Sequence, residues 1–331
     1  MKMITKIKPS GKFCRFIQEI RGSKYLLVHS VNTEKDTYID IFDIKDYSKA
    51  FSEKRNNLCY IAELRSGNFV MSYEKGKIEI GSIDFETKSL NVLQTLEDHG
   101  SDVYDIKELS NGNLVSCSNN GEIIFWSLNP ALSVYEKLKY FNFHPYEYSS
   151  LLEDIKRNKL ICAPCFDSSG TCIIDLNSYE KLATFEDIAG NGGNEIYFVN
   201  DNIVIDNSSA DEVGLFFIDM DKSKIVKHDE KFNDNRSSCF LKLKDGNLLC
   251  AVVIENKKMN LSGSSDEEEN NNDSGKDTGR TDIQCWQIDE TGLNWKLLCT
   301  KEKVDNYPIA CMTQLSDGKI VTGSDMIKVY N

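Results

Sequence analysis

The first residues that could do chemistry are two closely spaced cysteines, in Cys162-Ala-Pro-Cys165. Such a pair can bind zinc if two further ligands follow it, or act in redox chemistry if a helix N-terminus lowers the pKa of one thiol. Here Cys172 follows alone, the four histidines are scattered, and Cys162 lies in a predicted strand. We therefore expect both thiols to pack in the interior with no metal bound; a metal or redox site is the alternative.

Four aspartates could supply the paired carboxylates of acid–base catalysis: Asp154, Asp167, Asp206 and Asp211. Such pairs must lie within a few ångströms of each other, a distance that sequence spacing does not set. The chain has no G-x-S-x-G, H-E-x-x-H or phosphate-binding loop, and no helix pattern follows the glycine-rich run at 190–193. We predict that the protein is not an enzyme and needs no cofactor. A propeller-type hydrolase or lyase with a central carboxylate or metal site is the alternative.

The elements that would position these residues are short strands. The stretch from His99 to Leu128 contains three apolar–polar alternations, separated by turns at Ser110–Asn113 and Asn119–Gly121. Period-2 alternation indicates half-buried strands, and Asn-Gly indicates antiparallel hairpins. The first turn recurs at steps of about 44–46 residues, a period typical of β-propellers with four strands per unit. Its markers are Gly22, Gly67, Gly112, Asn158, Asn202, Gly246 and, after an insert, Gly318.

These markers predict an all-β fold: a seven-bladed β-propeller of four-stranded antiparallel blades, in a single domain that covers residues 1–331. The chain alternates over 2–8 before the first unit, and the last unit lacks an outer strand. The N-terminal strand is therefore expected to pair with the C-terminal blade and close the ring. The predicted blades are 13–51, 57–97, 99–143, 149–186, 194–231, 237–300, and 309–330 together with 2–8.

An acidic insert interrupts the sixth predicted blade at residues 256–281. It is rich in Asn, Ser, Asp and Glu and has no apolar periodicity, so we expect a disordered loop. Within it, Ser264 and Ser265 have acidic residues three positions further on, a pattern that acid-directed kinases prefer. These serines are candidate phosphorylation sites, and a solvated acidic loop without a regulatory role is the alternative.

The third unit resembles a WD-repeat (WD40) unit. The resemblance rests on His99, Val103, the Ser116–Gly121 run, Ile123 and Trp126. It implies a buried hydrogen-bond network of His99, Ser116, Asn120 and Trp126, with Asn120 where the family has Asp. In similar propellers, peptides dock on the face that carries the loops between second and third strands and at the channel mouth. On this chain the resemblance points to Tyr73, Glu74, Asp102, Tyr104, Asn119, Phe166, Asp167 and Arg236.

The composition restricts the class of binding partner and the cellular compartment that we expect for this protein. The net charge of −13 repels nucleic-acid backbones, so we expect no nucleic acid and instead a protein or peptide partner, possibly basic. No apolar run is long enough to span a bilayer, and no secretory signal is visible, so we expect no membrane association and a cytoplasmic, possibly nuclear, location. Most of the eleven cysteines follow the repeat, as buried hydrophobes would. The predicted function is that of a non-catalytic interaction scaffold.

Overall fold

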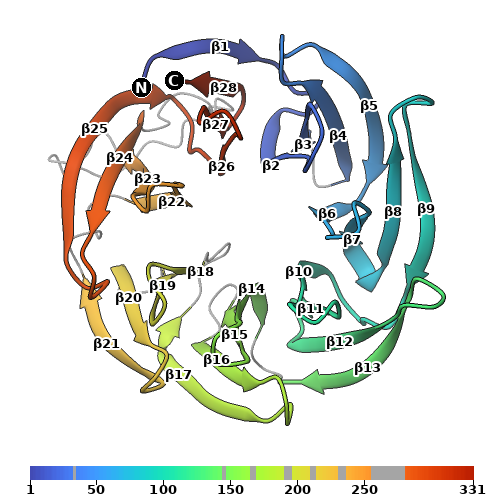
Figure 1. Cartoon of the computed structure of the whole chain (residues 1–331), viewed down its shortest axis with the longest axis vertical. Helices are drawn as coiled ribbons and strands as arrows, with labels where there is room; N and C mark the ends of the chain where they lie inside the picture. The colour runs from blue at the N-terminus through green and yellow to red at the C-terminus, as the bar shows by residue number, and fades with distance from the viewer. Residues whose placement is uncertain are drawn as a thin grey trace, which may run out of the picture.

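The computed structural model describes residues 1–32, 35–143, 147–164, 169–189, 196–208, 214–229, 236–254 and 280–331. In these residues the chain forms a ring of seven four-stranded antiparallel sheets around a central axis (Figure 1). The predicted all-β, seven-bladed propeller is therefore confirmed. The described part contains no helix that is long and apolar enough to cross a bilayer.

In the first six blades, four consecutive strands run from the central axis to the rim. The strands of blades one to three are β2 (Phe13–Glu19), β3 (Tyr25–Val31), β4 (Asp36–Asp43), β5 (Lys49–Asn56), β6 (Leu58–Glu63), β7 (Phe69–Tyr73), β8 (Ile78–Asp84), β9 (Ser89–Leu96), β10 (Val103–Glu108), β11 (Leu114–Ser118), β12 (Glu122–Asn129) and β13 (Val134–Asn142). Those of blades four to six are β14 (Tyr148–Asp154), β15 (Lys159–Pro164), β16 (Ser169–Asp175), β17 (Lys181–Ala189), β18 (Ile196–Phe198), β19 (Ile203–Ser208), β20 (Gly214–Asp219), β21 (Lys224–Asp229), β22 (Arg236–Lys242), β23 (Leu248–Ile254), β24 (Arg280–Ile288) and β25 (Trp295–Asp305). A short 3-10 helix, η1 (Glu74–Gly76), follows β7.

The seventh blade is assembled from both ends of the chain. Its inner strands are β26 (Cys311–Gln314), β27 (Ile320–Gly323) and β28 (Ile327–Tyr330), and its outer strand is β1 (Met3–Ile7). Met3 lies opposite Tyr330 and Ile7 opposite Ile327, and the two termini lie together at the rim (Figure 1). The predicted closure of the ring by the N-terminal strand is confirmed.

The core lies between the blades. Seven clusters of buried apolar side chains fill the seven junctions between neighbouring sheets. On β3, for example, Leu26 and Val28 face the seventh blade while Leu27 faces the second, because successive side chains of a strand point to opposite faces. Both faces of an inner strand are thus buried. None of the ten cysteines of the described part forms a disulfide, and most are buried, as expected of packing residues.

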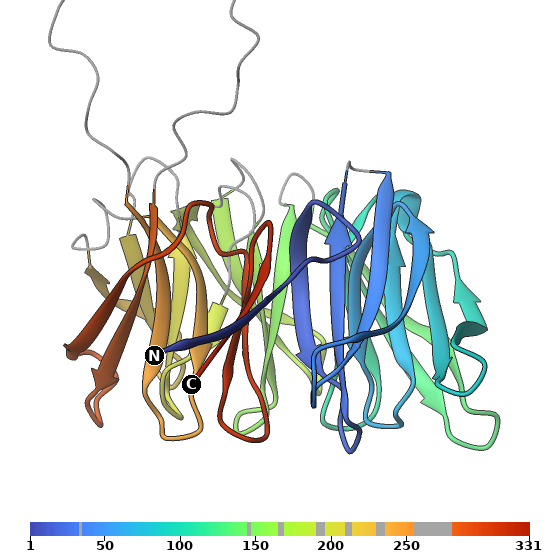
Figure 2. The same cartoon turned by 90° about the horizontal axis from the view of Figure 1, so that it is seen from above.

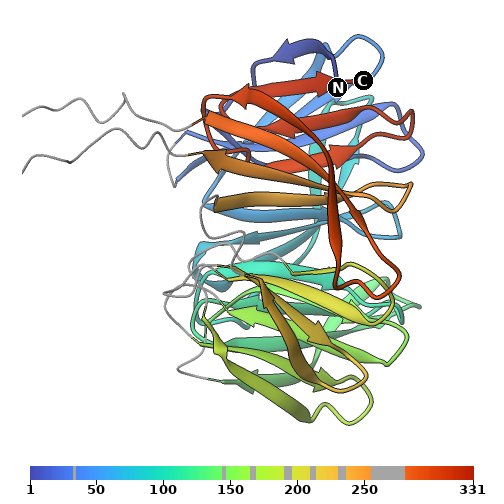
Figure 3. The ribbon, with the colours of Figure 1, turned by 90° about the vertical axis from the view of Figure 1, so that its left-hand side faces the viewer.

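Strands run between the two faces of the disc, which Figures 2 and 3 show edge-on. We call the face with the short turns between first and second strands the turn face, and the opposite face the loop face. The predicted markers Gly67 and Gly112 have φ values of +85° and +92°, a left-handed conformation that glycine adopts without a steric penalty. In the fourth blade Asn158 takes that position with φ +52°, which explains why the repeat persists there without glycine.

Every outer strand carries a β-bulge at the same level. At each bulge one residue of the outer strand has no partner across the ladder, and it is apolar in all seven blades: Ile4, Ala50, Leu93, Leu138, Leu182, Val226 and Leu298. A bulge twists the strand and interrupts its row of free hydrogen-bonding groups. The exposed edges of the disc are therefore poor templates for pairing with another chain.

Some predicted boundaries need correction. The outer strand β5 extends the first blade to Asn56 instead of residue 51, and β25 extends the sixth to Asp305 instead of 300. Residues 280 and 281, assigned to the acidic insert, begin β24, where they pair with Ile254 and Val253. The rest of the predicted insert, with Ser264 and Ser265, lies outside the described residues.

Candidate interaction site

The hydrogen-bond network predicted in the third blade forms around Ser116. Its Oγ lies 2.6 Å from His99 Nε2 and accepts a hydrogen bond from Trp126 Nε1 at 2.9 Å. All three side chains are buried. The network joins the loop that precedes β10 to the second and third strands of the blade, so the prediction is confirmed for these three residues.

The acidic position of this network is occupied by Glu122 and not by Asn120. Glu122 Oε2 lies 3.2 Å from His99 Nδ1 and accepts a hydrogen bond from the backbone N–H of Gly100 at 2.8 Å. Asn120 instead accepts a hydrogen bond from Ser118 Oγ at 2.5 Å. A carboxylate at the start of β12 accepts from both donors, whereas the shorter amide in the turn does not reach them. The sequence signal that could have identified Glu122 was an acidic residue directly after the Asn-Gly turn.

Burial lowers the pKa of His99 to about 4, although the hydrogen bond and charge of Glu122 act in the opposite direction. At neutral pH the imidazole is therefore uncharged, and the network holds one negative charge on Glu122. Its role is structural, because all of its polar groups are used within the blade.

In other blades, too, an acidic residue holds a chain segment on the loop face, but its hydrogen-bond partners differ from blade to blade. In the first blade, Asp40 accepts hydrogen bonds from the backbone N–H and the Oγ of Ser10, each at 2.6 Å. In the seventh, Asp305 lies 2.8 Å from Lys328 Nζ and accepts a hydrogen bond from Ser324 Oγ at 2.6 Å. The loop face is thus held in place by contacts that differ from blade to blade.

Several predicted binding residues meet where the second and third blades adjoin on the loop face. Asp102 Oδ1 accepts a hydrogen bond from the backbone N–H of Lys75 at 2.8 Å, and its carbonyl accepts one from the N–H of Asn119 at 3.1 Å. Burial, followed by the carboxylates of Asp102 and Glu74, raises the pKa of Cys59 to about 12. Asp102, Asn119 and Glu74 therefore form one group, with Cys59 beside them.

A second feature of the loop face is a bulge in the inner strands. In five blades the pairing of the inner strand with the second strand shifts its register at one residue; these residues are Arg15, Cys59, Tyr104, Ser149 and Ser238. In the first four blades this residue is partly or fully exposed, while the residue before it is buried. Bulges re-aim side chains in this way. The predicted residue Tyr104 is one of them, and Arg15 and Cys59 were not predicted.

The other predicted residues do not join this group. Tyr73 is only 4% exposed: its hydroxyl donates to Glu79 Oε2 at 2.6 Å, and Lys77 lies over its ring. The expectation of an exposed aromatic anchor at Tyr73 is therefore wrong, because its phenol is needed to pair a carboxylate inside the blade. Phe166 and Asp167 lie outside the described residues. Arg236 lies opposite Val253 at the start of β22, but its side chain is outside the described part.

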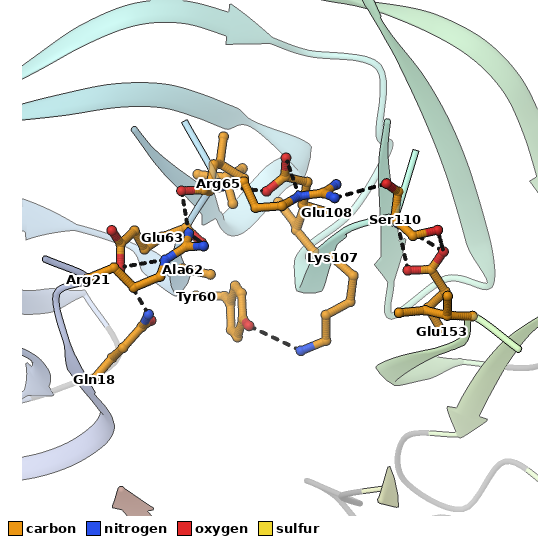
Figure 4. Close-up of a pocket in the computed structure, with 14 residues that line it drawn as sticks. Gln18, Arg21, Tyr60, Ala62, Glu63, Arg65, Lys107, Glu108, Ser110 and Glu153 are labelled. Atoms are coloured by element: carbon orange, nitrogen blue, oxygen red, sulfur yellow. Dashed lines mark hydrogen bonds and ion pairs between the residues drawn. The ribbon is translucent and has the colours of Figure 1, made fainter. Parts of the chain in front are cut away.

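A cavity of about 520 Å³ lies on the turn face, where no site was predicted (Figure 4). Residues of the first four blades line it, among them Arg21, Arg65, Tyr60, Lys107 and Glu153. Lys107 Nζ donates to the Tyr60 hydroxyl at 3.3 Å and lies 3.3 Å from Asp105. Burial alone would lower the pKa of Lys107, but Asp105 and Tyr60 raise it, so this amine stays charged.

The charged groups around this cavity are used to join neighbouring blades. A glutamate near the end of the inner strand in each of the first four blades accepts a hydrogen bond from a backbone N–H in a turn of the preceding blade. We call this the carboxylate clasp: Glu63 to Arg21 at 3.1 Å, Glu108 to Arg65 at 2.6 Å, Glu153 to Ser110 at 2.8 Å and Glu19 to Ser316 at 2.5 Å. Gln314 does the same for Lys244 at 2.9 Å. The cavity therefore lies among structural joints whose charges are already paired.

The candidate catalytic and metal residues do not form a site in the described part. The carboxylate of Asp154 is buried and lies 3.0 Å from Arg157, a structural ion pair. Asp167 and Asp211 lie outside the described residues, as does the side chain of Asp206. Cys165 is also outside them, so the predicted Cys162–Cys165 pair is untested. Among the residues described, no three His, Cys, Asp or Glu side chains gather as metal ligands.

No protein-family model matches this chain, and a search of curated proteins finds no match. The propeller fold and the side chains on the two faces of the disc are therefore the features from which a function can be inferred.

Proposed function

We propose that this protein is a divergent WD-repeat propeller that acts as a non-catalytic interaction scaffold. Its place of action is the cytoplasm, with the nucleus as a second location, and its partner docks on the loop face. The confirmed seven-bladed ring and the His99–Ser116–Trp126 network support the family assignment. A rigid disc offers a broad surface for a partner.

The observation that carries the proposal is the row of inner-strand bulges. Arg15, Cys59, Tyr104 and Ser149 lie at the same level of adjacent blades, next to the group formed by Glu74, Asp102 and Asn119. A partner at this end of the channel would meet an aromatic ring, a guanidinium and two carboxylates within one region. Aromatic and arginine side chains are the residue types that contribute most to protein–protein binding energy.

The proposed partner is a basic peptide or a protein with a basic segment. The chain carries a net charge of −13, and carboxylates are present at the proposed site. Charge complementarity of this kind accelerates association and weakens as salt screens it.

The test is binding of the purified full chain to a peptide array that contains Lys/Arg-rich sequences and matched sequences with Asp/Glu in their place. We expect binding to the basic set, a fall in affinity with added salt, and at least a tenfold loss for Tyr104→Ala and for Asp102→Asn. Lys156→Ala, an exposed position next to a turn-face turn, is the matched control and should bind as the wild type does. Binding that is unaffected by both loop-face variants would refute the proposed face, and binding that is independent of salt would refute the basic partner.

A further inference from the structure

Two cysteines lie directly opposite each other on the outer half of the sixth blade. Cys285 on β24 is the cross-strand partner of Cys299 on β25. Directly opposed residues of antiparallel strands have Cα atoms about 4.5–5.5 Å apart. This range falls within the roughly 4.4–6.8 Å that a disulfide requires. The backbone therefore places the two Cα atoms at a separation that a disulfide can bridge.

The pair is also within reach of solvent. Cys299 is exposed and Cys285 is partly exposed. Cys299 directly follows Leu298, the unpaired residue of the outer-strand bulge, which is 45% exposed. A small solute can thus approach Cys299 from the rim of the disc without any opening of the blade.

The fourth blade contains a matched pair that differs in one respect. Cys162 on β15 and Cys172 on β16 are also cross-strand partners, but both are completely buried. Burial raises the pKa of Cys162. The two pairs share a register relation and differ in access, so the fourth-blade pair provides an internal control.

We propose that Cys285 and Cys299 form a reversible disulfide by exchange with a low-molecular-weight disulfide such as oxidised glutathione. The thiolate of the exposed Cys299 attacks one sulfur of the oxidised glutathione and releases a first glutathione thiolate. The thiolate of Cys285 then attacks Cys299 Sγ in the mixed disulfide and releases the second glutathione. Two protein thiols are oxidised and one glutathione disulfide is reduced to two glutathione thiols, so atoms and electrons balance.

The order of the two steps follows from the structure. Cys299 reacts first because it is the more exposed of the two thiols. Cys285 reacts second because it is the less accessible, and burial together with the adjacent Cys299 raises its pKa. Only a thiolate attacks a disulfide, so the second step should accelerate as pH rises.

The experiment treats the folded full chain with oxidised glutathione and follows its intact mass and its cysteine-containing peptides. The wild type should lose the mass of two hydrogen atoms, with a disulfide that joins the Cys285 and Cys299 peptides, and reduced glutathione should reverse the change. Cys285→Ser should instead retain one glutathionyl group at Cys299. Cys299→Ser should react at least tenfold more slowly at position 285. Cys162 and Cys172 should stay reduced until the chain is unfolded.

Two results would overturn the proposal. One is a wild type that accumulates glutathione at Cys299 at the same level as Cys285→Ser, because the internal thiol would then not close the bond. The other is a folded wild type whose Cys299 does not react at all while the unfolded chain does. Circular dichroism of both variants, before treatment, separates these results from a failure to fold.

Discussion

The two faces of the disc are built by different rules. On the turn face the same carboxylate clasp recurs at the junctions of blades one to four and at the junction that closes the ring. On the loop face each blade anchors its approach in its own way: by Asp40 and Ser10 in the first, by Glu122 and His99 in the third, and by Asp305 and Lys328 in the seventh.

This difference reflects what each face must do. The four clasped junctions present the same problem on the turn face, a backbone N–H in a tight turn that needs an acceptor, and a glutamate from the next blade provides it. The loop face leaves side chains such as Tyr104 and Arg15 partly or fully exposed to solvent, each directly after a buried residue. Because the carboxylate clasps of the turn face hold the blades together, the side chains of the loop face can differ from blade to blade.

The largest expected effect concerns a buried histidine in the half of the first blade nearest the loop face. His29 is 1% exposed, and neither ring nitrogen has a hydrogen-bond partner in the described structure. Burial, followed by the charge of Arg15, lowers the pKa of His29 from its ordinary value of 6.5 to about 3. The unfolded chain therefore binds a proton more readily than the folded chain between pH 6.5 and 3. Stability should fall as pH decreases through this window, by about 3 kcal/mol at pH 4.

His29→Leu removes this titration, so its free energy of unfolding should decline less than that of the wild type by about 3 kcal/mol between pH 7 and pH 4. Urea unfolding at a series of pH values measures the difference. Parallel profiles for the two proteins would show that His29 is not held neutral by burial.

A smaller effect distinguishes Glu122 from Asn120 on the loop face. Glu122→Ala leaves the Gly100 N–H and the buried His99 without their acceptor, which should cost about 2–3 kcal/mol. Asn120→Ala removes hydrogen bonds to Ser118 and Glu122 but keeps the carboxylate that His99 and Gly100 contact, and should cost about 0.5–1 kcal/mol. Urea midpoints at pH 7 compare the two. If both variants lost the same free energy of unfolding, Asn120 would contribute to the network as much as Glu122 does.

The smallest effect tests the uniformity of the turn face. Glu63→Ala, Glu108→Ala and Glu153→Ala should each lower the free energy of unfolding by about 1–2 kcal/mol, because each removes an acceptor of a turn N–H near the surface. The three values should agree within about 0.5 kcal/mol, the scatter found for hydrogen bonds in mutational series. If the three losses of unfolding free energy differed as widely as those of the loop-face anchors, the turn-face contacts would not be more uniform than the loop-face contacts.

The number and order of the blades were predictable from the sequence because the turn markers have a physical cause. Gly67 and Gly112 adopt left-handed backbone conformations that few other residues tolerate, so they recur where the turn recurs. The exchange of Glu122 for Asn120 was not predictable in this way, because it depends on which side chain reaches His99 in space. Nor were the bulges, since an unpaired residue depends on the register between two strands and not on the pattern within either.

The carboxylate clasp is an intermediate case. Its glutamates, Glu19, Glu63, Glu108 and Glu153, stand at regular spacing near the ends of inner strands, so the signal was present in the sequence. Their role could not be predicted from the sequence, because each glutamate contacts a turn of the neighbouring blade that lies more than forty residues away. Only the packing of one blade against the next brings the acceptor and the donor together.

The pairing of β1 with β28 has a consequence for the order of assembly. A ribosome produces β1 first, yet the strand that receives it is made only after the other six sheets. Until then the newly made N-terminus has no partner in its sheet, and the nascent disc remains an open arc with an unfilled seam. The last sheet can therefore be completed only once β28 has been synthesised, and chaperones that shield unpaired strands would act before that moment.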